Sequence, residues 1–235
     1  MASELSVGVI VPVWNGERFL AEALDSVLAQ GHAPVDVVVV DDGSTDGSAA
    51  LAESYGAPVR VLRQANAGIG GARNSGFEAV AGELISFLDA DDLFTEDSIA
   101  RRVEVLAHEP DVDMVFGGVR RFSETDAGGT PIALNDSQPG YYPAAMLVRR
   151  VAYERVGRFP THTHAAEGLD WMLRARELGL GERMLAEQVL WRRIHGHNIS
   201  LRHRGEINEF AHLLKASLDR RRAAAAAREA TGEES

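Results

Sequence analysis

The chain has 235 residues, which is enough for one large domain with a hydrophobic core. Its net charge of −11 argues against extended nucleic-acid binding, and the absence of cysteine excludes disulfides, thiol catalysis and thiolate metal sites. The sequence shows neither a signal-peptide pattern at its N-terminus nor an apolar run near the ~20 residues of a membrane span, so we expect a cytoplasmic protein without a membrane span.

The first half of the chain alternates between two hydrophobic patterns. Continuous apolar runs predict buried strands at residues 7–13, 35–40, 59–62 and 83–88. Apolar residues at helical spacing predict helices at 19–28, from an Asp46 cap to 55, at 72–80 and from a Thr95 cap to 106. This β/α alternation predicts an α/β fold with a doubly wound, mostly parallel sheet.

The second half of the chain is less regular. The segment 123–140 is polar and rich in Gly, Pro and Asp, which predicts a loop or a lid. The basic run 220–222 continues the last predicted helix, and we interpret it as a solvated helix end rather than a site for nucleic acid or lipid. Strands are predicted at 114–118 and 189–194, and helices at 150–156, 169–178 and 206–218.

Acidic clusters follow two of the predicted strands. Asp41 and Asp42 come directly after the second strand, and Asp89, Asp91 and Asp92 come after the fourth. Ligands of open α/β sheets bind at the carboxyl ends of the strands, so these carboxylates are expected around one crevice. A divalent cation with oxygen ligands, such as Mg²⁺ or Mn²⁺, would offset their mutual repulsion. Turn formation or helix capping is the alternative role for either cluster taken alone.

A glycine-rich turn at 66–76 precedes the third predicted helix. It does not match a dinucleotide-binding fingerprint, because that motif follows the first strand, where residues 12–15 read Pro-Val-Trp-Asn. Such a turn can still present backbone N–H groups to a phosphate. Arg73 either adds a cation there or pairs with a nearby aspartate.

Four motifs, in this order, resemble those of the family 2 glycosyltransferases, which have the GT-A fold. They lie at residues 9–15, 41–46, 66–76 and 89–92, and the resemblance is strong over 1–120 and looser beyond. It implies a nucleotide-diphosphate sugar donor, with UDP as the default nucleotide. It also implies a divalent cation, Mn²⁺ or Mg²⁺, and inversion at the anomeric carbon.

The resemblance implies a donor site in the first half of the chain. Asp42 matches the position that meets the base, with Asp41 beside it. Asp89 matches a position of the DxD motif near the ribose or diphosphate, and Asp91 matches the metal carboxylate. Pro12 and Trp14 match positions that line the nucleoside pocket. The other expected donor-site residues are Asn15, Asn66, Gly68, Arg73 and Ala90.

The second half resembles the family at two further segments. Residues 167–174 resemble its Glu-Asp motif, but the position of the usual base falls on Gly168, which cannot accept a proton. Asp170, slightly favoured, and Glu167 are the candidates to replace it; helix capping and a solvated loop position are the respective alternatives. Residues 192–200 resemble a late Arg-x-His segment, in which His195 is a metal ligand, a phosphate donor or a structural histidine.

These features predict a metal-dependent inverting glycosyltransferase with a nucleotide-sugar-binding half (1–120), an acceptor and catalytic half (121–204) and a C-terminal helix and tail (205–235). The acceptor is left open among a natural product, a peptide and a cell-surface glycan. Gly168 keeps a catalytically impaired nucleotide-sugar-binding protein as the alternative. A sugar nucleotidylyltransferase is less favoured, since residues 14–19 lack its Gly-rich loop with Arg and Lys.

Overall fold

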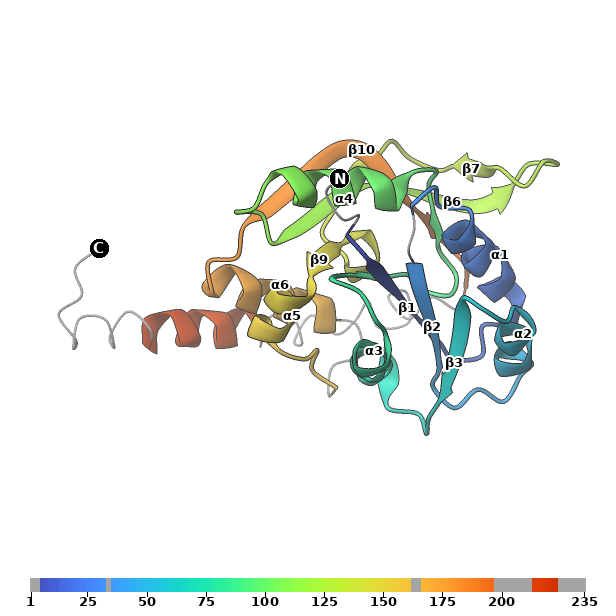
Figure 1. Ribbon diagram of the computed structural model, residues 1–235, viewed down its shortest axis with the longest axis horizontal. Coiled ribbons are helices and arrows are strands. Elements are labelled where there is room, and N and C mark those ends of the chain that lie inside the picture. Colours follow the sequence, from blue (N-terminus) through green and yellow to red (C-terminus); the bar gives the residue numbers. More distant parts are fainter. Residues whose placement is uncertain (1–4, 33–34, 162–165, 197–212, 224–235) are drawn as a thin grey trace.

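The computed structural model describes residues 5–32, 35–161, 166–196 and 213–223. Its strands are β1 (Val7–Val13), β2 (Val35–Asp41), β3 (Val59–Arg63), β4 (Leu84–Phe87), β5 (Leu93–Phe94), β6 (Met114–Thr125), β7 (Pro131–Ala133), β8 (Gln138–Gly140), β9 (Leu147–Arg149) and β10 (Glu182–Arg193). They form one sheet in the order β3-β2-β1-β4-β9-β6-β10-β5, with β7 and β8 paired to β6 (Figure 1).

Helices cover both faces of this sheet. They are α1 (Glu17–Leu28), α2 (Ser48–Ser54), α3 (Gly68–Ala79), α4 (Ser98–His108), α5 (Arg150–Val156) and α6 (Glu167–Glu177), with a short 3₁₀ helix η1 (Pro143–Ala145). One core cluster holds side chains of α1, α2 and α4, and the other holds side chains of α3, α5 and α6. The arrangement is the doubly wound α/β fold that the sequence predicts.

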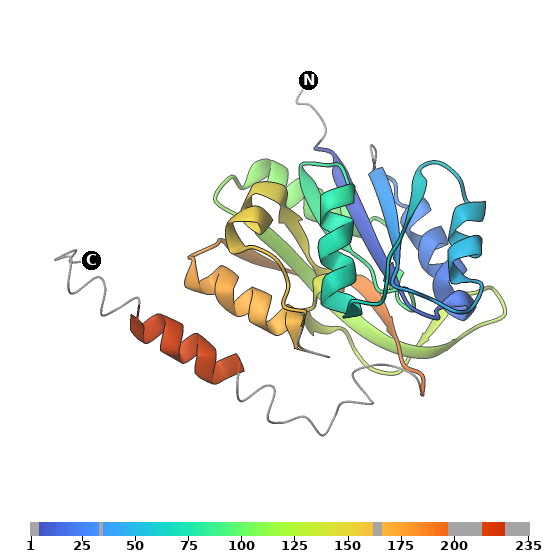
Figure 2. The same ribbon diagram turned by 90° about the horizontal axis from the view of Figure 1, so that it is seen from below.

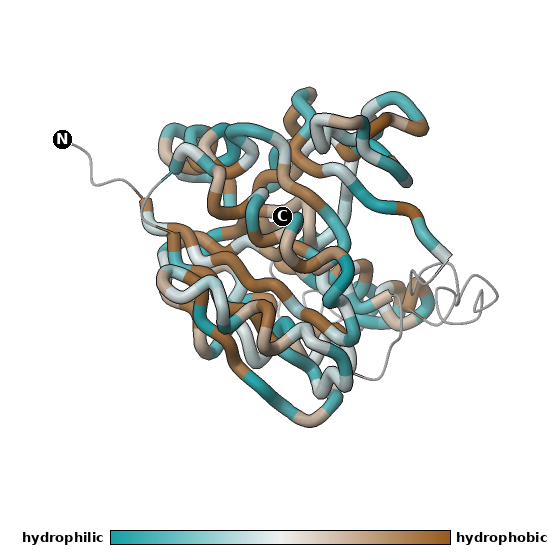
Figure 3. Tube along the Cα trace, turned by 90° about the vertical axis from the view of Figure 1, so that its right-hand side faces the viewer, coloured by the Kyte–Doolittle hydropathy of each residue, from teal (hydrophilic) through white to brown (hydrophobic). Residues whose placement is uncertain are grey.

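The parallel part of the sheet follows from its apolar strands. All seven residues of β1 are buried; β2 and β4 pair with β1, and β3 pairs with β2, all in parallel register. Strands covered on both faces are hydrophobic without alternation, and hydrophobic stretches run through the interior in Figure 3. The other part of the sheet is mixed, because β9 lies antiparallel between β4 and β6 while β10 lies parallel to β6.

The segment 123–140 was expected to be a loop or a lid, and this prediction is wrong. Strand β6 extends to Thr125, and β7 and β8 both pair back onto it in antiparallel register. These added strands are short and largely exposed, so their polar composition hides their strand character. The hydrogen-bonded ladder pairs the strand residues of this segment with the sheet.

Several predicted boundaries also shift. Helix α3 begins at Gly68 rather than 72, and β10 begins at Glu182, before the predicted 189. Thr95 does not cap α4: its hydroxyl donates to the carbonyl of Gln188 at 2.8 Å, and the helix begins after Asp97. The predicted helix 206–218 lies partly outside the described residues. In the described part of this region, residues 213–223 form a helix.

Helix 213–223 lies outside the α/β body and alongside α6 (Figure 2). Within the part of the chain that the structure describes, we find no helix whose length and apolar character would let it cross a lipid bilayer.

Candidate functional site

The loops that follow β1 and β2 are joined to each other. The backbone N–H of Asn15 donates to the Ser44 hydroxyl at 2.9 Å, and the Thr45 N–H donates to the Asn15 side-chain oxygen at 2.8 Å. Asn15 has a φ of 51°, a left-handed conformation that asparagine tolerates better than most residues. Beside it the Trp14 ring is 52% exposed, while Pro12 is buried within β1.

Asp41 and Asp42 are both buried at the end of β2. Asp41 accepts a hydrogen bond from the Ser44 N–H at 3.1 Å, and Asp42 accepts one from the Ala67 N–H at 2.8 Å. The Asn66 side chain donates to the Asp42 carbonyl at 3.0 Å. The second aspartate therefore holds the glycine-rich turn against the carboxyl end of β2, where Gly68, with a φ of 75°, begins α3.

The acidic loop after β4 contains one buried and two accessible carboxylates. Asp91 lies 2.8 Å from His195, measured from Oδ2 to Nε2, so the structure brings the two predicted metal ligands together. Asp92 is buried and accepts the Arg193 N–H at 2.8 Å. Burial raises the pKa of Asp92 well above its usual range, and the charges of Asp91 and Asp89 raise it further.

The residues present fit a cation that binds together with a ligand. Among the described residues, no group of three or more His, Cys, Asp or Glu side chains is placed to hold a metal ion. Asp91 and His195 provide one oxygen and one nitrogen ligand close to each other. Mg²⁺ commonly takes one or two carboxylates and fills its remaining positions with water and substrate phosphates. The set is therefore too small for a closed protein cage, but it suits a site shared with a phosphate ligand.

Arg73 connects the acidic loop to the start of α6. Its Nη2 donates to Asp89 at 2.7 Å, and its Nη1 donates to Glu167 at 2.6 Å. Burial alone would lower the pKa of Arg73, but the two carboxylates outweigh that effect and raise it. Ala90, next to Asp89, is half-buried against the core. Of the two roles expected for Arg73, the structure shows the pairing with an aspartate. The arginine also pairs with a glutamate 94 positions away.

Glu167 has acceptor capacity that the described residues do not use. Its Oε1 accepts from Arg73, whereas its Oε2 is buried and has no hydrogen-bond partner among the described residues. A buried carboxylate oxygen without a donor is unfavourable, because it has lost its water without replacement. This oxygen has the capacity to accept a proton or a hydrogen bond from a ligand.

A side chain at position 168 is excluded by η1. A Cβ built on Gly168 would lie 2.8 Å from both Cγ and Cδ of Pro143. Real Cβ atoms do not approach ring carbons so closely, so an aspartate there would require η1 to move. The resemblance to the family motif puts the position of the usual base at Gly168, but the contact with a proline 25 positions earlier is visible only in the structure.

Asp170 lies in a different network from Glu167. Its Oδ2 accepts from Arg174 at 2.8 Å, and its Oδ1 lies 3.7 Å from Nη1 of Arg220 in helix 213–223. The helix begins after Ala166 without a side-chain cap, so capping is not the role of Asp170. The aspartate joins α6 to its neighbours rather than to the acidic loop.

The sequence analysis missed Arg193 as an organiser of the site. Its N–H and Nε donate to Asp92 and to the Asp91 carbonyl, and its Nη2 donates to Glu22 at 2.7 Å. Phe19 of α1 lies beneath both this guanidinium and the His195 ring. The Arg-x-His pattern marks the segment, but the sequence alone does not reveal partners about 100 positions away.

The fold defines the class of protein. A parallel β1–β4 half with an acidic loop after β4, joined to a mixed half that carries α6, is the GT-A type of glycosyltransferase fold. Staphylococcus aureus TarS in complex with UDP-GlcNAc has this fold, with a TM-score of 0.68, 22% identity and coverage of 83% of this chain and 61% of that one. The mannosyltransferase PcManGT of Pyrobaculum calidifontis, in complex with GDP-Man and Mn²⁺, has a TM-score of 0.66, 20% identity and coverage of 86% and 61%.

Sequence comparison gives the family. The family described as "Glycosyl transferase family 2" matches residues 8–161, and the chain belongs to it. An uncharacterised glycosyltransferase of Nostoc is 44% identical over 105 residues, 43% of this chain and 33% of that protein. The uncharacterised glycosyltransferase EpsJ of Bacillus subtilis is 38% identical over 115 residues, 48% of this chain and 33% of that protein. The matched segment is thus about a third of each of these relatives.

Proposed function

We propose that this chain transfers a sugar from a nucleotide-diphosphate donor to an acceptor hydroxyl, with inversion at the anomeric carbon. The observation that carries the proposal is the Arg73 bridge between Asp89 and Glu167. It places a carboxylate with unused acceptor capacity next to the acidic loop. The UDP-GlcNAc and GDP-Man complexes of the two structurally similar proteins support a nucleotide-sugar donor, and UDP is our default nucleotide.

The donor nucleotide binds at the carboxyl ends of β1 and β2. The exposed Trp14 ring offers a stacking surface for the base, and the start of α3 offers backbone N–H groups to a phosphate. Asp91 and His195 would hold Mg²⁺ or Mn²⁺, which would neutralise charge on the departing diphosphate. Arg193 fixes the acidic loop through Asp92, so that this loop keeps its shape around the donor.

Glu167 is the proposed base. As the acceptor oxygen bonds to the anomeric carbon and the bond to the diphosphate breaks, the acceptor proton passes to Oε2 of Glu167. Arg73 holds the other oxygen and supplies a compensating positive charge. The contacts favour Glu167 over Asp170, because Arg174 and Arg220 face both oxygens of Asp170.

A second candidate function is nucleotide-sugar binding without turnover. The ring of Pro143 against Gly168 favours it, because this contact closes the usual position of the base. The two functions share the donor site and differ only in whether a proton acceptor acts there.

Thermal unfolding in the presence of UDP, GDP and their sugar conjugates, with and without Mn²⁺, tests the donor site. A ligand that binds only the folded state adds about 2.7 kcal/mol of stability at 100 times its Kd, which is a readily measured shift. The Asp91→Ala variant should lose the metal-dependent part of the shift. If no nucleotide stabilises the wild-type chain, both candidate functions are wrong.

Release of nucleoside diphosphate from the donor that stabilises best tests turnover. We expect Glu167→Gln to bind the donor normally and to lower the release rate by about 10²–10⁴-fold, the usual contribution of a general base. Asp170→Asn is the matched control and should stay close to wild type. The reverse pattern would assign the base to Asp170, and donor binding without release in the wild type would support the binding protein.

A further inference from the structure

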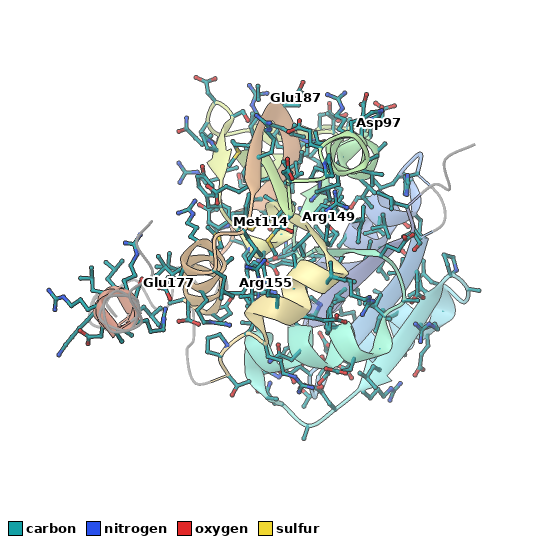
Figure 4. All side chains as sticks on the ribbon, turned by 60° about the vertical axis from the view of Figure 1, so that its left-hand side comes forward. Asp97, Met114, Arg149, Arg155, Glu177 and Glu187 are labelled. Atoms are coloured by element: carbon teal, nitrogen blue, oxygen red, sulfur yellow. The ribbon has the colours of Figure 1, made fainter. Side chains whose placement is uncertain are left out.

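Helix 213–223 packs on α6 through one of its sides. Leu213 and Ser217 are buried, and the side chains of Ser217 and Arg220 both donate to Glu177 of α6. These three helix residues are four and three positions apart, so they lie on one face of the helix. The helix itself lies outside the α/β body, and Figure 4 shows side chains that project from it away from α6. Its other side therefore faces solvent.

Two leucines lie on this solvent side. Leu214 and Leu218 are each 51% exposed, and they are one helical turn apart. Arg221 and Arg222 follow Leu218 by three and four positions, so both are its neighbours on the helix. Lys215, three positions before Leu218, is a further neighbour, and all three cations are exposed. The solvent side thus presents an apolar pair next to three cations.

The other charges on the helix leave its solvent side positive. The carboxylate of Asp219 lies 3.9 Å from the guanidinium of Arg222, but both side chains are exposed, so water screens this pair. Arg221 also acts on Glu177 through its charge. Three cations against one carboxylate make this side locally positive, although the net charge of the chain is −11.

The structure divides the basic run 220–222, which we interpreted from the sequence as a solvated helix end. Arg220 is directed at α6, where it pairs with Glu177. Arg221 and Arg222 are exposed on the side that carries the two leucines. The exposed part of the run therefore belongs to an amphipathic surface, which the basic residues alone do not indicate.

The small size of the apolar pair favours a lipid surface over a protein partner. A specific protein interface buries about 800 Å² on each partner and needs a matching shape, and two half-exposed leucines supply little of that area. A lipid surface needs no matching shape. Leucine side chains enter the boundary between headgroups and acyl chains, and long cationic side chains reach the lipid phosphates. The three cations then favour lipids with a net negative charge.

We propose that the solvent side of helix 213–223 is a docking surface for an anionic lipid membrane. Leu214 and Leu218 enter the headgroup boundary, and Lys215, Arg221 and Arg222 contact lipid phosphates. The helix lies in the plane of the membrane surface and does not cross it. This surface is separate from the donor site, so the proposal does not rest on the proposed function.

Flotation of the full chain with lipid vesicles tests the docking surface. One set of vesicles contains phosphatidylcholine alone, and the other contains equal amounts of phosphatidylcholine and phosphatidylglycerol. At low ionic strength we expect the chain to bind the anionic vesicles at least tenfold more tightly than the neutral ones. This preference should fall as salt is added, because salt screens exposed charges.

Paired substitutions then locate the binding. Leu214→Gln with Leu218→Gln should weaken binding to the anionic vesicles by about tenfold, because the apolar contact is lost while glutamine still favours a helix. Arg221→Gln with Arg222→Gln should also weaken this binding by about tenfold and should reduce its salt dependence.

Two matched controls lie elsewhere on the surface. Leu134→Gln replaces a leucine that is 57% exposed, and Arg101→Gln replaces an exposed arginine of α4; neither should change vesicle binding. Hydrogen exchange of residues 213–223 shows whether the helix persists in each paired variant. The thermal shift with donor and Mn²⁺ should persist in all of these variants.

Four outcomes would overturn the proposal. Three are equal binding to both sets of vesicles, binding to neither, and binding that the paired substitutions leave unchanged. The fourth comes from sedimentation equilibrium: self-association that the leucine substitutions abolish would mean that a second copy of the chain covers the leucines. Failure of the proposed function is a separate result, because it appears as a wild-type chain that no nucleotide stabilises.

Discussion

Position 168 shows how one residue alters the chemistry open to this chain. Gly168 is buried, and the Pro143 ring occupies the space beside it. We expect Gly168→Ala to lower the free energy of unfolding by about 1–3 kcal/mol, the usual cost of forcing extra atoms into a packed site. Urea denaturation measures this change. Gly196→Ala is the control and should have little effect, because a Cβ at Gly196 would meet no atom of the described residues within 4 Å.

The same contact predicts the result of restoring an aspartate. Gly168→Asp adds a carboxylate to the same closed space, so we expect it to destabilise the fold and not to raise nucleoside diphosphate release. A stable Gly168→Asp variant with faster release would show that η1 yields readily, and that the contact with Pro143 does not exclude a base at this position.

At the scale of elements, the long apolar strands were predictable, and the short strands β7 and β8 were not. The valine-rich sequences of β1 and β2 predict buried strands in a parallel sheet. Strands that are covered on both faces have continuous apolar sequences instead of an alternating pattern. Strands β7 and β8 are short, exposed and polar, so their pairing with β6 determines their conformation instead. A hydrophobic pattern in the sequence indicates burial, so it cannot reveal strands that are largely exposed.

Helix 213–223 depends on one carboxylate of α6. Glu177 accepts hydrogen bonds from Ser217 and from Arg220, and Figure 4 shows it on α6 beside that helix. Burial would raise the pKa of Glu177, but these hydrogen bonds outweigh it and hold the pKa below its usual value of 4.5. Because the pKa is lowered, ionised Glu177 stabilises the packing of helix 213–223 on α6 at pH values above 4.5. This contribution is lost as the pH falls through the pKa that Glu177 has in the folded protein.

Hydrogen exchange of residues 213–223 tests this contact. At neutral pH, Arg220→Gln and Glu177→Gln should each speed exchange of the helix amides, because each leaves the other side chain without its charged partner. Arg221→Gln is the control on the same helix and should speed exchange less than Arg220→Gln, since Arg221 is exposed and acts on Glu177 through its charge alone. Equal effects of the two arginine substitutions would indicate a general charge effect instead of a specific contact.

At the scale of the molecule, the two halves meet through pairs that a linear pattern cannot show. The acidic loop and the Glu167 segment are both recognisable by their residue types and by their resemblance to family motifs. Their connection through Arg73, and the anchoring of the acidic loop by Arg193, depend on side chains that meet only when β4, β10 and α6 converge. Residue type and resemblance therefore predict the candidate groups of the site, and the fold determines which of them are partnered.

The Arg73 bridge should be important for stability as well as for the site. Arg73→Met leaves Asp89 and the buried Glu167 without their shared cation, so we expect a loss of about 3–5 kcal/mol in the free energy of unfolding, as for other broken buried ion pairs. Arg158→Met is the control: Arg158 pairs with Glu78 at a similar 2.6 Å, but both side chains are exposed, so the loss should stay under about 1 kcal/mol. Urea denaturation of both variants makes the comparison. Similar losses would mean that water reaches the Arg73 bridge, and that the bridge adds little to the packing and strand pairing that join the two halves.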